Sequence, residues 1–259
     1  MGVLNVTPDS FSDGGKFLDP GRAEEAALRM RDEGAHFLDI GGESSRPGAR
    51  QISWREEIRR ILPVLKRIVP KIKIPISVDT YKYEVASAVL GEGALIINDI
   101  QGLRSGKKLA RLIAQHKASV VLMHMRGTPG TMQKDPRYKS VVREVMDSLR
   151  RSARTAREAG IERSRILLDP GFGFGKTSEH NFELLSHLDR FAGLGYPVLV
   201  GLSRKSFLGN LLGLPVDERL YASLAGAAAA IERGAHVLRV HEVLPHRQLM
   251  TIADRLECS

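Results

Sequence analysis

The sequence predicts one α/β domain that spans residues 1–259 and folds as a single (β/α)8 barrel. Three observations predict this fold: eight short apolar runs, the helical stretches that alternate with them, and one pattern that recurs at three helix–strand junctions. Barrels of this kind reach about 250 residues as one domain. Regular alternation of strands and helices favours parallel pairing with right-handed crossovers.

The apolar runs are the expected strands. They cover residues 3–6, 37–40, 74–78, 95–97, 120–123, 166–168, 198–200 and 237–240. The stretch 53–69 has apolar residues at helical spacing, and we expect a capping box between Ser53 and Glu56 at its start. A doubly wound open sheet also holds eight such units. The barrel is favoured because no run marks a point at which the strand order reverses.

The recurring pattern joins the end of a helix to the start of a strand. Its glycines are Gly34, Gly93 and Gly234. Glycine adopts the left-handed conformation that ends a helix, and the apolar residues after it are typical of a strand buried on both faces. The polar residues five positions after these glycines are Asp39, Asn98 and Arg239. Equal offsets predict equal depth and facing for these side chains at the mouth of the barrel.

The composition excludes several classes of protein. With 42% hydrophobic and 27% charged residues, the chain is typical of a globular protein. No apolar stretch approaches the roughly 18 residues of a membrane span, so we expect no membrane segment. The net charge of +9 is spread along helical stretches among acidic residues, which argues against nucleic-acid binding. The only cysteine, Cys258, has no disulfide partner, so we expect a reducing, cytoplasmic compartment.

Three long, glycine-rich loops follow expected strands, at residues 7–15, 41–48 and 126–133. Active sites of such barrels are built from the loops at the carboxyl ends of the strands. Long loops in a compact domain usually serve as lids or binding loops. We therefore expect the active site at this end.

A glycine-rich segment at residues 169–177 follows the sixth expected strand. It matches neither nucleotide-binding template, because Pro170 and Lys176 stand where each template requires a glycine. We interpret its glycines as allowing the backbone to approach a flat ligand, with Phe172 or Phe174 as an apolar wall and Asp169 as a carboxylate. A tight turn with a solvent-facing aspartate is the alternative.

Asp79 and Asn98 should face the same mouth as Asp169. Two carboxylates and an amide bind a neutral heterocycle rich in N–H donors. Each of them taken alone is equally typical of a helix cap. No third carboxylate or histidine stands at ligand spacing, so these residues do not predict a metal site.

Cations follow the seventh and eighth expected strands. Ser203 and Lys205 come after the seventh, and Arg239 and His241 end the eighth. Such barrels commonly bind phosphate at this position, so we predict an anion site, with an ordinary charged rim as the alternative. For His124 the sequence leaves packing and ligand binding open.

These segments together resemble the dihydropteroate synthase family. The matching segments are 1–15 (MGVLNVTPDSFSDGG), 39–48 (DIGGESSRPG), 77–80 (SVDT), 97–100 (INDI), 123–125 (MHM), 169–176 (DPGFGFGK), 203–205 (SRK) and 239–241 (RVH). The resemblance implies a TIM-barrel homodimer that joins 6-hydroxymethyl-7,8-dihydropterin diphosphate to p-aminobenzoate and releases diphosphate. A pterin-dependent methyltransferase of the same superfamily is the alternative, although it should lack the segments 45–47 and 203–205.

The resemblance also implies the roles of the site residues, with Asp79, Asp169 and Lys205 as the catalytic set. The pterin ring would contact Asp79, Asn98, Asp169, Lys205, Met123 and Phe174. The diphosphate would contact Arg239, His241 and Asn5, and Asn5 would also ligate a Mg²⁺ ion. The p-aminobenzoate pocket would be formed by Ser45, Arg46, Pro47, Phe11 and Ser203. Two departures are visible: Glu242 stands where the family usually has aspartate, and the chain begins without the short segment that many members carry.

Overall fold

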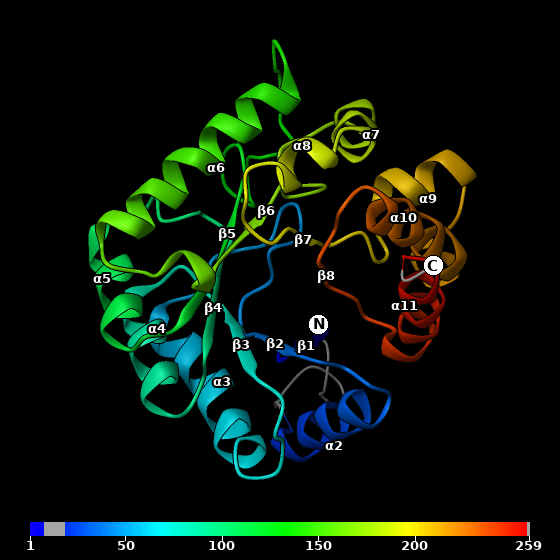
Figure 1. Cartoon of the computed structure of the whole chain (residues 1–259). Coiled ribbons are helices and arrows are strands. Elements are labelled where there is room, and N and C mark those ends of the chain that lie inside the picture. The colour runs from blue at the N-terminus through cyan, green and yellow to red at the C-terminus, as the bar shows by residue number, and fades with distance from the viewer. Residues whose placement is uncertain (8–18, 258–259) are drawn as a thin grey trace.

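The structure is a computed structural model, and it describes residues 1–7 and 19–257. Strands lie in the middle of the molecule, and the helices form a ring around them (Figure 1). Of the predicted site residues, Phe11 lies outside the described residues, as does most of the predicted loop 7–15.

All eight expected strands are present, each with bounds within two residues of the prediction. They are β1 (Gly2–Asn5), β2 (Leu38–Gly41), β3 (Ile76–Asp79), β4 (Ile96–Asp99), β5 (Ser119–Met123), β6 (Ile166–Asp169), β7 (Leu199–Val200) and β8 (Val237–Leu238). Buried aliphatic residues such as Leu38, Ile40 and Val78 pack the outer faces of these strands against the helices.

The strand order is that of a barrel. β1 to β6 pair in parallel in chain order, and β7 pairs in parallel with β8. The two sheets are joined by isolated parallel bridges, Leu168 with Val198 and Gly2 with Val240. Because the order never reverses, the doubly wound alternative is excluded.

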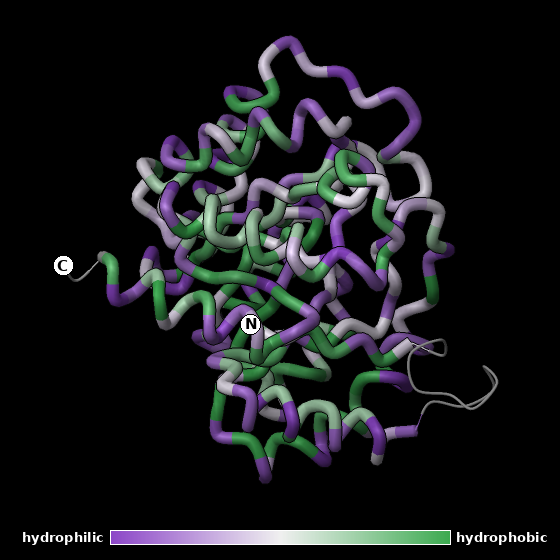
Figure 2. The backbone as a smooth tube through the Cα atoms, turned by 90° about the vertical axis from the view of Figure 1, so that its right-hand side faces the viewer, coloured by the Kyte–Doolittle hydropathy of each residue, from purple (hydrophilic) through white to green (hydrophobic). Residues whose placement is uncertain are grey.

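The helices that surround the strands pack apolar faces inward. They are α2 (Pro20–Asp32), α3 (Trp54–Ile68), α4 (Tyr83–Gly91), α5 (Lys107–Gln115), α6 (Val141–Glu158), α7 (Ser178–Ser186), α8 (Asp189–Ala192), α9 (Ser206–Leu212), α10 (Leu220–Glu232) and α11 (Val243–Glu257). Hydrophilic and hydrophobic residues alternate along them (Figure 2). Within the described part of the chain, none of these helices has both the length and the apolar character needed to cross a bilayer.

The start of α3 confirms one half of the expected capping box. The Ser53 side chain accepts a hydrogen bond from the Glu56 backbone N–H at 3.2 Å. The second half of the prediction is wrong, because the Glu56 carboxylate binds Arg59 and Arg60 instead, each at 2.8 Å. An ion pair one turn along the helix competes for the same carboxylate.

The three glycines of the recurring pattern end helices as expected. Gly34, Gly93 and Gly234 have φ angles of +92°, +100° and +87°. Each lies directly after the last helical cap residue, which is the usual position of a left-handed glycine.

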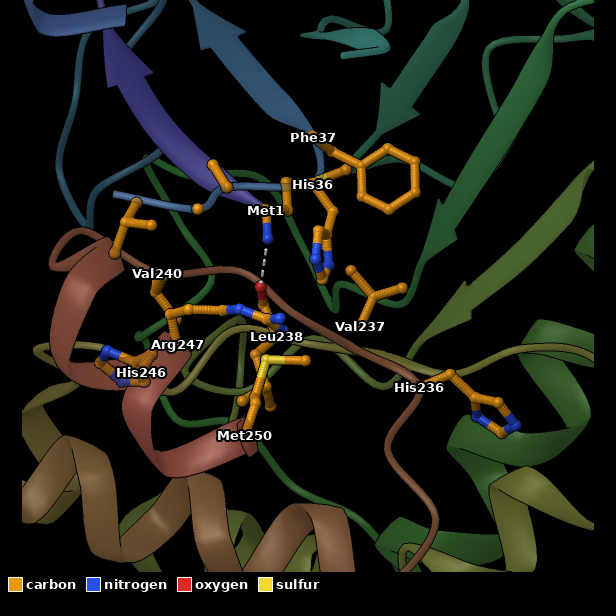
Figure 3. Close-up of a pocket in the computed structure, with 13 residues that line it drawn as sticks. Met1, His36, Phe37, His236, Val237, Leu238, Val240, His246, Arg247 and Met250 are labelled. Carbon is orange, nitrogen blue, oxygen red and sulfur yellow. Dashed lines mark hydrogen bonds between the residues drawn. The ribbon is translucent and has the colours of Figure 1, made fainter. Parts of the chain in front are cut away.

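A small cavity of about 50 Å³ lies at the amino-terminal end of the barrel (Figure 3). It is lined by residues that include Met1, Phe37, Val237 and Met250. None of the predicted site residues lines it. Because catalysis in such barrels occurs at the opposite end, we do not assign the active site to this cavity.

Candidate active site

The barrel interior changes from apolar to polar toward the carboxyl ends of the strands. Near the amino-terminal ends, inward-facing Ile96, Val121 and Leu199 form an apolar cluster with Phe37, Leu167 and Val237 packed against it. Side chains alternate between the two faces of a strand, so the next inward-facing residue lies two positions later. On the even-numbered strands these residues are Asp39, Asn98, Asp169 and Arg239. On the odd-numbered strands they are Asn5, Asp79, Met123 and Gly201.

The equal-offset residues do meet, as predicted. Asp39 Oδ2 accepts a hydrogen bond from Asn98 Nδ2 at 3.0 Å and from Arg239 Nε at 2.6 Å. Arg239 Nη2 also donates to Asp79 Oδ2 at 3.2 Å. Asp39 is fully buried. It therefore lies deeper in the barrel than the mouth, which is where the sequence analysis predicted it. Its carboxylate orients the guanidinium of Arg239, a role that the sequence did not suggest.

Buried polar atoms without a protein partner point to a ligand above this layer. Asp39 Oδ1 and Asn98 Oδ1 have no hydrogen-bond partner among the described residues. An unpaired buried polar atom costs about 1–3 kcal/mol. Such a cost is typical of a site in which water or a ligand completes the hydrogen bonds.

Asp169 occupies the end of β6 and is 6% exposed. Its Oδ1 accepts a hydrogen bond from the Gly171 backbone N–H at 2.7 Å. Burial raises the pKa of Asp169, while the Gly171 hydrogen bond and the charge of Lys205 oppose that rise. The structure thus contradicts the alternative of a solvent-facing aspartate.

Lys205 lies over the ring of Phe174, with Nζ 4.3 Å from the ring centroid. Burial lowers the pKa of Lys205 to about 8, against the opposing charge of Asp169. Phe174 is therefore the aromatic residue at the site. Phe172 is buried in the core and stacks on Phe207 at 6.3 Å.

The glycine-rich loop makes a close backbone approach, but to the chain after β5; the predicted approach to a flat ligand stays a prediction. Gly171 has φ +72°, and a Cβ atom there would lie 2.0 Å from the backbone oxygen of His124. Lys205 borders the same loop, since its Nζ would lie 3.4 Å from a Cβ atom at Gly173.

Replacing Gly171 by alanine should abolish activity and reduce solubility, because the clash is with backbone. Gly213→Ala is the matched control, since Gly213 has φ +67° with nothing within 4 Å of its Cβ position. The control should cost only the backbone strain, about 1 kcal/mol. Thermal unfolding and turnover measure both effects, and equal behaviour of the two variants would contradict the close approach.

Residues of the anion site predicted after β7 and β8 lie together, with a distribution of charge that differs from the prediction. The Ser203 hydroxyl and His241 Nδ1 lie 2.9 Å apart. Burial, together with the charges of the nearby Arg204 and Arg239, lowers the pKa of His241 to about 4. The imidazole is therefore neutral at pH 7. Positive charge comes from Lys205 and Arg239, and the expectation of a cationic His241 is wrong.

Comparison with known proteins decides the family. Residues 1–241 match the family model described as pterin binding enzyme. The chain belongs to this family. It is 45% identical over 254 residues to the dihydropteroate synthase of Escherichia coli strain K12, covering 98% of this chain and 90% of that protein.

Solved structures of the family agree with the fold and confirm the resemblance. The dihydropteroate synthase of Xanthomonas albilineans with 4-aminobenzoic acid has a TM-score of 0.92 and 45% identity, covering 100% of this chain and 92% of that one. The same enzyme in complex with 7,8-dihydropteroate has a TM-score of 0.89 and 41% identity, covering 100% and 93%.

The predicted lid of this pterin-binding enzyme lies on the loop between β2 and α3. Ser45 is half-buried, and Arg46 and Pro47 are exposed. The loop touches the loop after β5, where the Gly48 backbone N–H donates to the Pro129 carbonyl at 3.1 Å. The two predicted loops are therefore neighbours at the mouth of the barrel.

Asn5 ends β1, paired with Gly41. A Cβ atom at Gly41 would lie 3.5 Å from Asn5 Oδ1, so the amide packs against this end of β2 at ordinary contact distance. Among the described residues there is no group of three or more His, Cys, Asp or Glu side chains that could hold a metal ion. An amide oxygen suits Mg²⁺, which keeps most of its ligands as water and phosphate oxygens.

Lys176 holds the glycine-rich loop together through hydrogen bonds, a role that the sequence analysis did not predict. Its Nζ lies 2.8 Å from the Gly171 carbonyl, 3.0 Å from the Phe174 carbonyl and 3.0 Å from His124 Nδ1. Burial lowers the pKa of Lys176 to about 7. His124 is thus a packed, hydrogen-bonded residue, and burial holds its pKa at about 2. A lysine directly after a run of glycines was the available signal.

Proposed function

We propose that this chain catalyses the dihydropteroate synthase reaction, the joining of 6-hydroxymethyl-7,8-dihydropterin diphosphate to p-aminobenzoate. The observation that carries the proposal is the polar layer of Asp79, Asn98 and Asp169 beside the cations Lys205 and Arg239. A ring-binding cradle and an anion site meet there at one barrel mouth. The family membership and the dihydropteroate synthase relatives support the same reaction.

The cradle suits the edge of a pterin ring. That edge offers adjacent N–H donors, the complement of the Asp169 carboxylate. Asn98 Oδ1, which has no partner among the described residues, supplies another acceptor. Met123 is buried beside the cradle and, with Phe174, offers the apolar faces that a flat ring needs.

The cations suit the diphosphate. Lys205 lies over the Phe174 ring of the cradle, and the charges of Asp169 and Asp79 act on it, so in this proposal it stands between ring and leaving group. Arg239 is held from below by Asp39, and neutral His241, whose Nδ1 lies 2.9 Å from the Ser203 hydroxyl, adds hydrogen-bonding capacity without charge. Asn5 is the residue that would hold Mg²⁺, which when bound neutralises diphosphate charge.

In the proposed reaction the protein orients the two substrates and stabilises the charges that develop on them. The aminobenzoate nitrogen forms a bond to the pterin methylene carbon, the bond from that carbon to the diphosphate oxygen breaks, and the amine loses a proton. Lys205 and Arg239 stabilise the departing anion, while Asp79 and Asp169 stabilise positive charge that develops on the ring. None of these reaction steps uses a nucleophile from the protein.

The second substrate belongs at the β2–α3 loop. Ser45, Arg46 and Pro47 lie on that loop, and Ser203 follows β7 at the same end of the barrel. Arg46 supplies a cation for the aminobenzoate carboxylate. The Xanthomonas albilineans enzyme was solved with 4-aminobenzoic acid, which supports such a pocket in this family.

The cytoplasm stays the expected compartment, on the ground of the single cysteine.

Activity should fall above about pH 8. Burial lowers the pKa of Lys205 to about 8. Above that pH Lys205 loses its positive charge, which weakens the attraction for diphosphate. The measurement is kcat/KM for the pterin diphosphate from about pH 6 to about pH 10. Lys205→Arg should move the decline to higher pH, whereas a profile that stays flat to pH 10 would refute the assignment.

We also propose that the enzyme is a homodimer. Large apolar residues are exposed on α9, α10 and α11, which lie side by side (Figure 1). They are Leu211, Leu212, Tyr221, Leu244, Ile252 and Leu256. Exposed apolar surface gathered on neighbouring helices is typical of an interface. Sedimentation at micromolar concentration should give a dimer that Tyr221→Glu weakens, and a monomeric wild type would contradict the proposal.

One assay tests the function. Diphosphate release should require both p-aminobenzoate and Mg²⁺, and dihydropteroate should form in equal amount. Release without the amine would indicate a hydrolase. Transfer of a methyl group in place of the pterin would indicate the methyltransferase alternative.

A further inference from the structure

A buried ionic cluster lies at the base of the β2–α3 loop. Glu43 Oε2 accepts hydrogen bonds from the Ile52 backbone N–H at 2.8 Å and from Lys82 Nζ at 2.7 Å. Glu43 Oε1 accepts a hydrogen bond from the Tyr81 hydroxyl at 2.8 Å. Lys82 Nζ also donates to Glu57 on α3. One carboxylate thus contacts its own loop and the segment that follows β3.

Glu43 closes the loop on itself. Glu43 and Ile52 lie nine positions apart, at the two ends of the segment that carries Ser45, Arg46 and Pro47. The Gly42 carbonyl, directly before Glu43, accepts a hydrogen bond from Arg60 on α3 at 3.0 Å. The base of the loop is therefore held, while Arg46 and Pro47 at its tip are exposed.

The cluster is built from groups that water does not stabilise. The side chains of Glu57, Glu43 and Lys82 are 1%, 8% and 13% exposed. Buried charges of this kind persist only when each is paired and hydrogen-bonded. Two carboxylates share one ammonium here, and burial raises the pKa of Glu57 although Lys82 opposes that rise. Glu43, with three donors, is the better satisfied carboxylate.

We infer that Glu43 is a positioning residue for the second substrate. It holds the β2–α3 loop in the conformation that presents Ser45, Arg46 and Pro47 to the aminobenzoate, and it does so from the base of the loop without touching the substrate. The inference rests on the proposed function, since that function places the aminobenzoate at this loop. The pterin cradle is built from strand ends, and Glu43 reaches its edge only through the hydroxyl of Tyr81, whose ring packs in the same apolar cluster as Met123 and Phe174.

The central variant is Glu43→Gln, which keeps the size of the side chain and removes its charge. We expect the KM for p-aminobenzoate to rise about tenfold, with the KM for the pterin diphosphate changed less than about twofold. Glu57→Gln is the matched control, because it removes a carboxylate from the same lysine but not from the loop. It should leave both KM values within about twofold of wild type.

Two further variants, Arg46→Ala and Tyr81→Phe, test the role of the loop and the role of Glu43 separately. If Arg46→Ala leaves the KM for p-aminobenzoate unchanged, the proposed role of the loop fails. If Arg46→Ala raises it and Glu43→Gln does not, the positioning inference alone fails. An equal rise of both KM values in Glu43→Gln would also overturn the inference. If Glu43→Gln does not fold, Tyr81→Phe tests the same carboxylate, because it removes one of the three donors and should raise the same KM by about threefold.

Discussion

Asp169→Asn should lower kcat/KM for the pterin diphosphate by about 10²- to 10⁴-fold while the barrel still folds. Two charge-assisted hydrogen bonds to the ring, each worth roughly 1.5–3 kcal/mol, account for a loss of this size. Asparagine keeps the shape, and its oxygen can still accept the Gly171 N–H that Asp169 accepts at 2.7 Å. The loss should therefore appear in turnover more than in thermal unfolding.

Asp99 offers the matched control for this change. It is also a buried aspartate at a strand end, and its carboxylate accepts backbone hydrogen bonds from Gln101 and Leu103, each at 2.7 Å. Along β4 it follows Asn98, so it faces away from the barrel axis. Asp99→Asn should lower the melting temperature and spare kcat/KM. The assignment of Asp169 fails if both variants retain wild-type turnover.

Arg239→Met should cost about 3–5 kcal/mol of folding free energy in addition to activity. The substitution leaves the carboxylates of Asp39 and Asp79, now bound at 2.6 Å and 3.2 Å, without their shared cation. Asp39 is fully buried, so its carboxylate would lose the cation that compensates for its desolvation. Urea unfolding measures the loss of stability, and the diphosphate-release assay measures the loss of activity.

The double variant Asp39→Asn/Arg239→Met separates the two effects. Neutralising Asp39 removes one unpaired buried charge, so part of the lost stability should return. Activity should not return, because the cation for the diphosphate is still absent. A double-mutant cycle for unfolding should give a coupling free energy of about 1–3 kcal/mol between the two residues. Additive effects, or recovery of turnover in the double variant, would show that Asp39 does not act through Arg239.

Much of the fold and of the site was predictable from local sequence. The eight strands lie within two residues of their predicted bounds because buried parallel strands are short apolar runs with clear ends. The glycines at 34, 93 and 234 are readable because a left-handed helix end demands that residue type. Equal offsets from these glycines place Asp39, Asn98 and Arg239 in one layer, since side chains alternate along a strand.

Only the tertiary structure decided what these side chains do to one another. Asp39 and Arg239 are 200 positions apart, and their hydrogen bond exists because barrel closure brings the end of β8 beside β1, the strand that pairs with β2. The protonation of His241 and the choice of Phe174 over Phe172 depend on burial, which no local pattern encodes. Lys176 and Glu43 escaped prediction for the same reason. From sequence alone a charged residue is expected to lie in solvent. Only the packed structure shows that backbone carbonyls or buried partners surround it.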